Sequence, residues 1–386
     1  MRILMLHSRY LSGAASGENR VVDNEVAVLR EEGHEVATWF PAPHPESRVG
    51  QAHLGLRTVW SGSSVSTVRS MAREFEPDLI HLHNLFPMLS PSVIREASRV
   101  APVVMTLHNY RLMCLPATFL RDGRPCQECL GKKPTAGVLH RCYRNSAAGS
   151  AALASSMVLH RLLGTFGHVS LFLAVSHFLA NKHIEAGLER TTIEICPNFS
   201  PPVPKRRGPG DHFLFAGRLA PEKDLITVLR SWKPEFGRLV LLGDGPDAEQ
   251  LRAMAPLGVD FVGSVGREAV SRWFNSARAL IVPSLSFEGC PQSILEAYAA
   301  GVPVIANRVG AIPEFVSQGR SGLLIEPRNV RMLGEALSHL LVDRESIRLG
   351  EHALARWREE FAPHAHLARL ERAYEQAAAR VSLARD

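Results

Sequence analysis

Glu288 and Glu296 are the first residues whose type and spacing suggest chemistry. They lie in SFEGCPQSILEAYAAG, residues 286–301, among small and apolar neighbours. Eight helical residues would separate them by roughly 12 Å, more than the ~5–9.5 Å between the carboxyl groups of a glycosidase pair. A carboxylate accepts two hydrogen bonds from a vicinal diol. We therefore expect each glutamate to bind a different part of one extended ligand, with solvated side chains as the alternative.

Two cations follow an apolar run in the second half of the chain. Arg218 comes directly after HFLFAG (212–217), and Lys223 lies five residues on, in the expected first turn of a helix. The helix macrodipole disfavours a cation at that end, so a lysine there indicates an anionic ligand nearby. Arginine offers phosphate a planar fork and lysine a point charge. Two solvated surface charges are the alternative interpretation.

Glycine-containing turns precede two of the expected helices. Gly13 and Gly17 lie in HSRYLSGAASGENR, after the first apolar run, and Gly310 lies in VGAIPEF. Such a turn can bring backbone N–H groups to an anion at the helix N-terminus. Neither turn matches a Walker or dinucleotide motif, so ordinary turns are equally consistent with the sequence.

Short apolar runs alternate with helical periodicity along the chain, which predicts parallel sheets covered by helices on both faces. The expected strands are 2–7, 34–40, 78–83, 102–108, 171–176 and 193–197, then 212–217, 238–243, 259–263, 279–284, 303–308 and 322–327. Five prolines in 197–209 separate the two sets. We expect an α/β fold of two Rossmann-like, doubly wound domains facing a cleft, 1–200 and 201–365. A final helix, 366–386, is expected to pack back on the first domain.

Charge and composition limit the classes of partner. The 386 residues carry a net charge of +6, with scattered basic residues and few aromatic ones. A basic balance favours anionic partners, but nucleic acid is not expected without a groove lined by stacking rings. No apolar run approaches the ~20 residues of a membrane span, and the start lacks the pattern of a signal peptide. We expect a cytoplasmic protein with peripheral contact at the inner face of an anionic membrane.

An insertion at 109–146 interrupts the alternation and holds four cysteines. They are Cys114, Cys126, Cys129 and Cys142, spaced C-x11-C-x2-C-x12-C. Four thiolates that include a C-x2-C pair suit a structural zinc, which would staple a segment with little core of its own. Disulfides, which a reducing compartment disfavours, and thiols without a ligand are the alternatives. We expect the insertion to shape acceptor binding.

Several motifs, taken in their order along the chain, resemble the retaining glycosyltransferases of family 4 and their GT-B fold. They are EGHEV (32–36), CPNFS (196–200), GRLAPEKD (217–224), GDGP (243–246), FVGSV (261–265) and, most specifically, E-x7-E from Glu288 to Glu296. The resemblance covers nearly the whole chain. The chain departs from the family in SGAASGE and VGAIPE, where paired glycines are common, and at Cys290, where phenylalanine is commoner.

The resemblance implies a UDP- or GDP-linked sugar donor, held mainly by the second domain, and a glycan or lipid-linked acceptor, as in cell-surface polysaccharide synthesis. Arg218 and Lys223 would bind the diphosphate, Glu296 the ribose hydroxyls and Glu288 the transferred sugar. The remaining donor-site residues would be His108, Gly17, Gly289 and Gly310. The chain contains no D-x-D, so no catalytic divalent metal is expected. Transfer would retain the anomeric configuration.

Besides the sugar-nucleotide epimerases, a related enzyme class with a similar two-domain shape, two alternatives from other classes remain at this point. GDGPDA, residues 243–248, matches G-x-G-x-x-A with Asp260 further on, a nominal fingerprint of an NAD-dependent oxidoreductase. Pro246 in the turn and the position on the second strand of its domain count against it. The other alternative is a non-catalytic sugar-nucleotide-binding protein. The joint presence of Glu288, Arg218 and Lys223 argues against that one.

Overall fold

The computed structural model describes residues 1–10, 16–42 and 48–383 and divides into two compact units. Unit 1 comprises Met1–Phe119, Cys126–Pro197 and Leu367–Asp386, and unit 2 comprises Leu120–Pro125 and Asn198–His366. The boundaries expected from sequence were 200/201 and 365/366. One difference is that 120–125, inside the insertion, group with unit 2, whereas we expected the whole insertion in the first domain.

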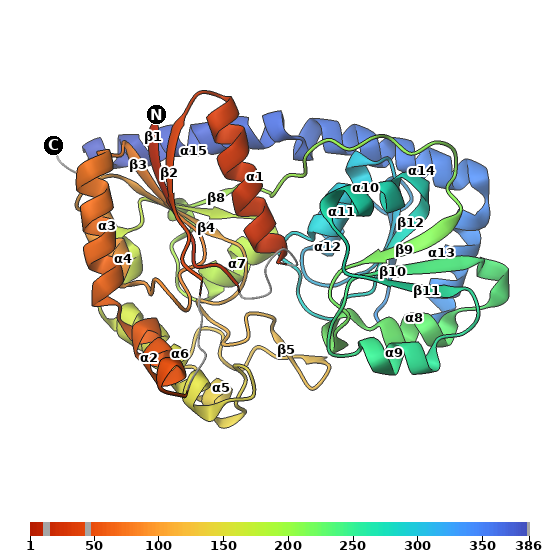
Figure 1. The fold of residues 1–386 in the computed structure, drawn as a ribbon, viewed down its shortest axis with the longest axis horizontal. Helices are drawn as coiled ribbons and strands as arrows, with labels where there is room; N and C mark the ends of the chain where they lie inside the picture. The colour runs from red at the N-terminus through yellow and green to blue at the C-terminus, as the bar shows by residue number, and fades with distance from the viewer. Residues whose placement is uncertain (11–15, 43–47, 384–386) are drawn as a thin grey trace. The chain divides into compact units, whose positions relative to one another are not determined.

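Unit 1 is built on one parallel sheet with the strand order β2-β1-β3-β4-β7-β8 (Figure 1). Its strands are β1 (Arg2–Leu6), β2 (Glu35–Trp39), β3 (Leu79–Leu82), β4 (Val103–Leu107), β7 (Leu171–Ala174) and β8 (Ile193–Ile195). Its helices are α1 (Gly17–Glu31), α2 (Arg48–Val59), α3 (Gly62–Phe75), α4 (Ser92–Ala97), α5 (Thr135–Leu139), α6 (Ala147–Leu162), η2 (Thr165–His168), α7 (His177–Glu185), η3 (Arg190–Thr192) and, for most of its length, α15 (Pro363–Leu383). All six strands predicted for this half are confirmed.

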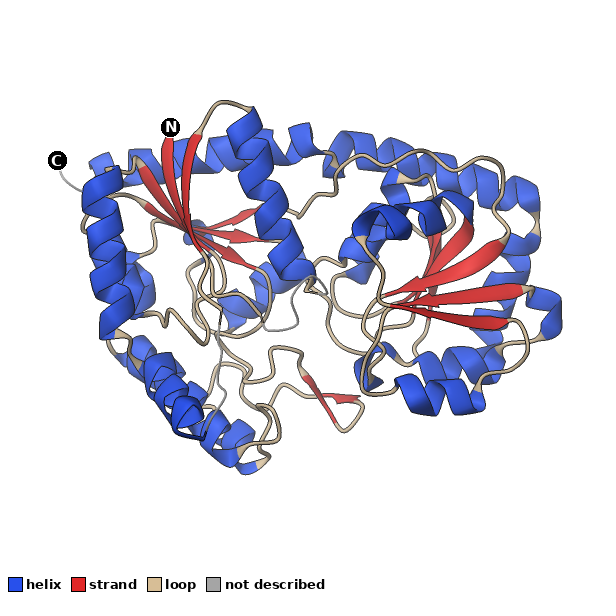
Figure 2. Cartoon of the chain, viewed as in Figure 1, coloured by secondary structure: helices blue, strands red, loops and turns tan. Residues whose placement is uncertain are grey.

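The strands of unit 1 are continuous apolar runs because helices cover both faces of their sheet (Figure 2). Successive side chains point to opposite faces, so Ile3 and Met5 of β1 share one core. Val22 of α1 and Leu370 and Tyr374 of α15 pack into that same core. The last helix of the chain therefore completes the hydrophobic core of the first unit.

Unit 2 is built on a second parallel sheet, ordered β11-β10-β9-β12-β13-β14. In order of appearance this is 3-2-1-4-5-6, the arrangement of dinucleotide-binding folds. The strands are β9 (His212–Ala216), β10 (Arg238–Leu242), β11 (Val259–Gly263), β12 (Ala277–Val282), β13 (Val304–Asn307) and β14 (Gly322–Ile325). The helices are η4 (Pro221–Lys223), α8 (Leu225–Ser231), η5 (Pro234–Phe236), α9 (Ala248–Met254), α10 (Arg267–Ser276), α11 (Gln292–Ala299), α12 (Ile312–Phe315), α13 (Val330–Leu341), α14 (Asp343–Arg356) and η6 (Trp357–Phe361). The six strands predicted here are also confirmed.

The proline-rich connector before β9 has no regular element, and a buried arginine holds it. Arg206 is 5% exposed, and its guanidinium donates to the carbonyl oxygens of Pro209 at 2.9 Å and Ala277 at 3.1 Å. It also donates to Ser346 Oγ at 3.0 Å. Burial lowers the pKa of Arg206 to about 10, so the side chain stays charged at neutral pH. The middle residue of the KRR cluster thus has a structural role.

The cysteine-containing insertion after β4 forms little regular structure. It contains a short antiparallel pair, β5 (Leu120–Arg121) and β6 (Arg124–Pro125), and the single turn of α5.

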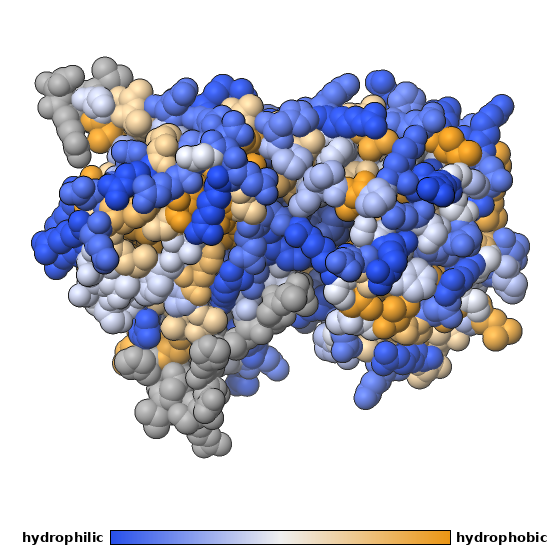
Figure 3. Space-filling model, turned by 45° about the horizontal axis from the view of Figure 1, so that its top comes forward, coloured by the Kyte–Doolittle hydropathy of each residue, from blue (hydrophilic) through white to orange (hydrophobic). Residues whose placement is uncertain are grey.

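Hydrophilic residues cover most of the face shown in Figure 3. Within the described residues, no helix is both long enough and apolar enough to cross a membrane.

Candidate functional site

The donor-site residues expected in the second half lie beyond the ends of β9 and β12, which are neighbours in the sheet. These two strands flank the point where the strand order reverses, and ligands bind at this point in open α/β sheets. Arg218 and Lys223 follow β9, and Glu288 follows β12. Buried Asn307, at the end of β13, donates to Pro283 O at 2.7 Å and supports the loop that carries Glu288.

Lys223 and Glu288 form an ion pair at this edge. Lys223 Nζ donates to Glu288 Oε1, and Ser284 Oγ donates to the same oxygen at 2.8 Å. The two ion-paired side chains are only 23% and 20% exposed. Burial raises the pKa of Glu288, but the Lys223 charge and the hydrogen bonds from Lys223 and Ser284 outweigh it and bring the pKa below its usual value. Glu288 is therefore an anion at neutral pH, already oriented by two donors.

Arg218 has a more open environment. Its side chain is 63% exposed, and Nη2 donates to Glu222 Oε1 at 2.5 Å. Each of these two cations thus lies beside a carboxylate. One expectation was wrong: Lys223 does not lie in the first turn of an α-helix but ends the short helix η4, before α8. The anion beside it in this structure is Glu288.

Glu296 lies inside α11, whereas Glu288 lies in the loop before that helix. Glu296 is half-buried, and its neighbours Leu295 and Ala297 are fully buried. Gly289 separates Glu288 from the helix start. The two glutamates therefore belong to different elements, and Glu288 is the one whose ion pair with Lys223 is described above.

Three glycines of unit 2 bring backbone segments into close contact. A Cβ on Gly310 (φ +58°) would crowd the backbone of Phe287 and Glu288, and Ala311 N donates to Glu288 O at 3.2 Å. Gly310 therefore supports the Glu288 loop directly. A Cβ on Gly243 or Gly245 would overlap the carbonyl oxygens of Gly217 and Leu219, respectively.

These contacts explain the nominal NAD fingerprint by packing. Gly243 and Gly245 pack closely against the segment that carries Arg218. In the same contact, Leu219 N donates to Asp244 O at 2.9 Å. Asp260, the acidic residue of that fingerprint, lies in β11 and pairs with Arg238 at 2.5 Å. The glycines of the G-x-G-x-x-A motif therefore position the loop that carries Arg218.

In unit 1, His108 follows β4 and joins a group of histidines at the strand ends. Its Nε2 lies 2.8 Å from His83 Nδ1, and the two rings are stacked with centroids 5.1 Å apart. Burial lowers the pKa of His108 well below its usual value, and the nearby His83 lowers it further. His108 is therefore neutral at physiological pH. It lines a cavity of about 20 Å³, which suits one small polar group.

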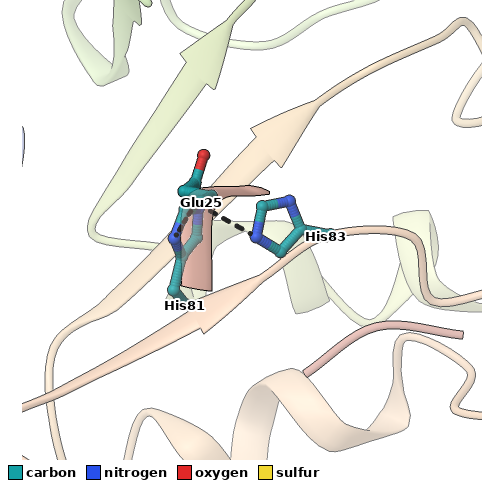
Figure 4. Close-up of side chains that lie close together, drawn as sticks. All are labelled: Glu25, His81 and His83. Carbon is teal, nitrogen blue, oxygen red and sulfur yellow. Dashed lines mark ion pairs between the residues drawn. The ribbon is translucent and has the colours of Figure 1, made fainter. Parts of the chain in front are cut away.

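Behind His108 lies a buried group that the sequence reasoning missed. Glu25 of α1, His81 of β3 and His83 are 2%, 0% and 0% exposed. Figure 4 shows both rings directed at the Glu25 carboxylate, with Oε1 3.2 Å from His81 Nδ1 and 3.4 Å from His83 Nε2. Two signals were available. His81 and His83 are an i, i+2 pair on one strand face, and Glu25 interrupts the apolar stripe of α1.

Gly17 is the first residue of α1, whose N-cap Ser16 accepts from Asn19 N. Gly13 lies outside the described residues. Beside Gly17, Glu18 accepts hydrogen bonds from Asn109 Nδ2 at 3.0 Å and Tyr10 OH at 3.2 Å. Burial raises the pKa of Glu18 to about 7, and the hydrogen bond from Asn109 opposes that rise. An ionised Glu18 would disfavour a phosphate at this helix start, so Gly17 is the least supported donor residue.

The four cysteines of the insertion do not form a metal-ligand group comparable to the buried one. Among the described residues, three ligand atoms within 4.8 Å of one another are found for Glu25, His81 and His83. Two of the cysteines lie near Gly137. A Cβ added to Gly137 would be 3.5 Å from Cys129 Sγ, and the backbone N–H of Cys142 donates to Gly137 O at 2.9 Å. Burial raises the pKa of Cys114 to about 11, which disfavours its thiolate. The zinc hypothesis stays a prediction.

Comparison with known proteins agrees with this geometry. A model described as Glycosyltransferase Family 4 matches residues 15–201, and one described as Glycosyl transferases group 1 matches residues 210–343. The chain belongs to the family 4 glycosyltransferases. Its two six-stranded parallel sheets are those of the GT-B fold, as the motifs predicted.

Three similar proteins illustrate the range of this glycosyltransferase family. A GDP-mannose-dependent alpha-(1-6)-phosphatidylinositol monomannoside mannosyltransferase of Mycobacterium tuberculosis is 34% identical over 36% of this chain, a match that spans only 42% of the relative's length. A GDP-mannose-dependent alpha-mannosyltransferase of Mycolicibacterium smegmatis is 26% identical over 89% of this chain and 90% of its own length. The structure of Anabaena HepE in complex with UDP has a TM-score of 0.65 at 16% identity, covering 96% of this chain and 99% of that one.

Proposed function

We propose that this protein is a retaining glycosyltransferase that moves a sugar from a UDP- or GDP-linked donor to a glycan or lipid-linked acceptor. The observation that carries the proposal is the Lys223–Glu288–Ser284 group at the point where the sheet order of unit 2 reverses. It provides a cation for a leaving diphosphate and an ionised carboxylate for sugar hydroxyls on adjacent loops.

In this proposal the main task of unit 2 is electrostatic. Negative charge builds on the diphosphate as the glycosidic bond breaks, and preorganised cations stabilise that charge in the transition state. Arg218 and Lys223 supply these cations, Glu288 holds the transferred sugar and Glu296 the ribose. Gly289 and Gly310 shape the loop around Glu288. No residue is assigned as a general base, and no catalytic divalent metal is invoked.

Unit 1 contributes His108 to the transferred sugar and contains a hollow of about 480 Å³ suited to part of an acceptor. Its lining combines the apolar residues Phe86, Leu112, Met113, Met157, Phe166 and Phe172 with polar ones that include Arg161 and Glu189. Phe86 and Leu112 also line the small cavity beside His108. An acceptor with an apolar portion would fit, in agreement with the glycolipid named for the mycobacterial relative. Peripheral contact with an anionic membrane remains part of the proposal. Co-sedimentation that is independent of acidic lipid would count against it.

A thermal-shift panel of UDP, GDP, ADP and their sugars tests the donor class. We expect UDP- or GDP-sugars to raise the thermal midpoint. Glu296→Ala should lower the affinity for the nucleotide at least tenfold, because the ribose hydroxyls lose two acceptors. Arg218→Ala should lower turnover about 10²-fold or more with the fold intact. The exposed Arg267→Ala, at the start of α10, is a matched control and should behave as wild type. Full binding and activity in both site variants would refute the assignment.

A further inference from the structure

The buried carboxylate of Glu25 is linked to His108 through a single ring. Glu25 Oε1 lies 3.4 Å from His83 Nε2, and the other ring nitrogen of His83, Nδ1, lies 2.8 Å from His108 Nε2. Glu25 comes from α1, His83 from the end of β3 and His108 from the end of β4. Three separate elements of unit 1 therefore form one line of polar groups that ends at the proposed sugar-contacting residue.

With Glu25 ionised and His83 neutral, these groups allow one consistent placement of protons. A carboxylate only accepts, and a neutral imidazole has one N–H donor and one lone pair. If His83 faced Glu25 with its lone pair, two acceptors would repel each other in a buried, low-dielectric place. In that state His83 Nε2 carries the proton, and its 3.4 Å separation from Glu25 Oε1 is an electrostatic contact rather than a hydrogen bond. His83 Nδ1 is then the acceptor for His108 Nε2–H.

We propose that Glu25 is a positioning residue that fixes, through His83, the tautomer of His108, leaving the lone pair of His108 Nδ1 to accept a hydrogen bond from a hydroxyl group. That the hydroxyl belongs to the transferred sugar rests on the proposed function, whereas the tautomer itself does not. The neighbouring ring of His7 is neutral, because burial lowers the pKa of His7 to about 3.

A competing occupant of the same group would give the opposite tautomer. The ligand atoms of Glu25, His81 and His83 lie within 4.8 Å of one another and have the side-chain types of a divalent-metal site. A cation bound to His83 Nε2 would leave the proton on His83 Nδ1, which would then donate to His108 Nε2. The structure favours the proton network, because His81 Nδ1 is already 2.8 Å from Tyr374 OH. The tautomer of His108 separates the two cases.

The decisive measurement is a long-range ¹H–¹⁵N correlation spectrum of the full chain labelled with ¹⁵N-histidine. His108→Gln and His83→Gln assign the two rings. We expect His108 to be protonated at Nε2 in the wild type. Protonation at Nδ1 would overturn the proposal without any further variant. One equivalent of metal that survives Cys129→Ser and is lost in Glu25→Gln would also overturn it, in favour of a metal site.

Variants test whether Glu25 is the cause. In Glu25→Gln the amide can donate as well as accept, so His108 should lose its single-tautomer signals, whereas Glu25→Asp should retain them. Glu96→Gln is the matched control, because Glu96 is also buried in unit 1 but pairs with Arg69 at 2.6 Å. Unchanged His108 signals in Glu25→Gln would refute the causal role.

Turnover gives a separate readout. Replacing a group that orients another functional side chain typically costs 10–100-fold, so kcat of Glu25→Gln should fall about tenfold. His108→Ala with full turnover would contradict the proposed function while leaving the tautomer result intact. The two failures are therefore distinguishable.

Discussion

At the scale of single residues, the site depends on which of its buried carboxyl groups stay ionised. Glu288 is held ionised by Lys223 and Ser284, whereas burial raises the pKa of Glu18 to about 7 and destabilises its anion. Glu18 Oε1 is enclosed and makes no hydrogen bond within the part of the chain that the structure describes. The pKa values of these two carboxyl groups thus shift in opposite directions, because Glu288 accepts hydrogen bonds from Lys223 and Ser284 whereas burial outweighs the hydrogen bonds to Glu18.

Glu18 should make stability depend on pH near neutrality. Its pKa is about 7 in the folded protein and near 4.5 when unfolded, so between these values the folded state holds a proton that the unfolded state has lost. The free energy of unfolding should therefore fall as pH rises from about 4.5 to 7. Glu18→Gln should abolish this slope in denaturant titrations at pH 5, 6, 7 and 8. The exposed Glu31→Gln on the same helix should keep it, and an unchanged slope in Glu18→Gln would contradict the assignment.

At the scale of elements, close backbone contacts decide where the site loops lie. Gly243 has φ +129°, and a side chain there would overlap Gly217 O beside Arg218. Gly310 performs a similar task for the Glu288 loop. Such contacts cannot be recognised from a turn motif alone, because the partner backbone is distant in sequence.

Gly243→Ala should destabilise the protein by about 3 kcal/mol or more, because backbone must move and the conformation is strained for alanine. It should also weaken nucleotide stabilisation by displacing the Arg218 loop. Gly266→Ala is the control, since φ is −68° and nothing lies within 4 Å of the new Cβ. Urea unfolding measures both variants. Equal stability of the two would show that the Gly217 contact is unimportant.

The cysteine insertion gives a prediction about metal. If its thiolates hold a structural zinc, purified reduced protein should contain one equivalent that a chelator removes and that Cys126→Ser or Cys129→Ser reduces. Removal should lower the thermal midpoint because the insertion has little core of its own. Cys196→Ser, in the core of unit 1, is the control and should leave the zinc content unchanged. A folded, reduced sample without zinc would end the hypothesis.

At the scale of the whole molecule, the chain returns to its first unit at its end. Leu370 of α15 is 1% exposed in the core that β1 and α1 share. The same helix supplies Tyr374, whose hydroxyl lies 2.8 Å from His81 Nδ1. The C-terminal helix is thus part of both the core and the polar group of unit 1.

Leu370→Ala should lower the free energy of unfolding by about 2–5 kcal/mol, the usual cost of a cavity at a buried leucine. Exposed Glu375→Ala, one turn away on α15, should change it by less than about 0.5 kcal/mol. Differential scanning calorimetry would compare the two. A Leu370→Ala midpoint equal to that of Glu375→Ala would mean that α15 does not stabilise unit 1.

The sequence by itself determined the twelve strands of the two parallel sheets, the connector and the loops that carry Arg218 and Glu288, because hydrophobic periodicity and proline placement are local properties. Only the tertiary structure decided that Lys223 pairs with Glu288, that Arg206 is buried, and that Glu25, His81 and His83 meet behind His108. These contacts join residues from different elements. Which side chains face one another therefore follows from strand order and helix packing, which spacing along the chain does not encode.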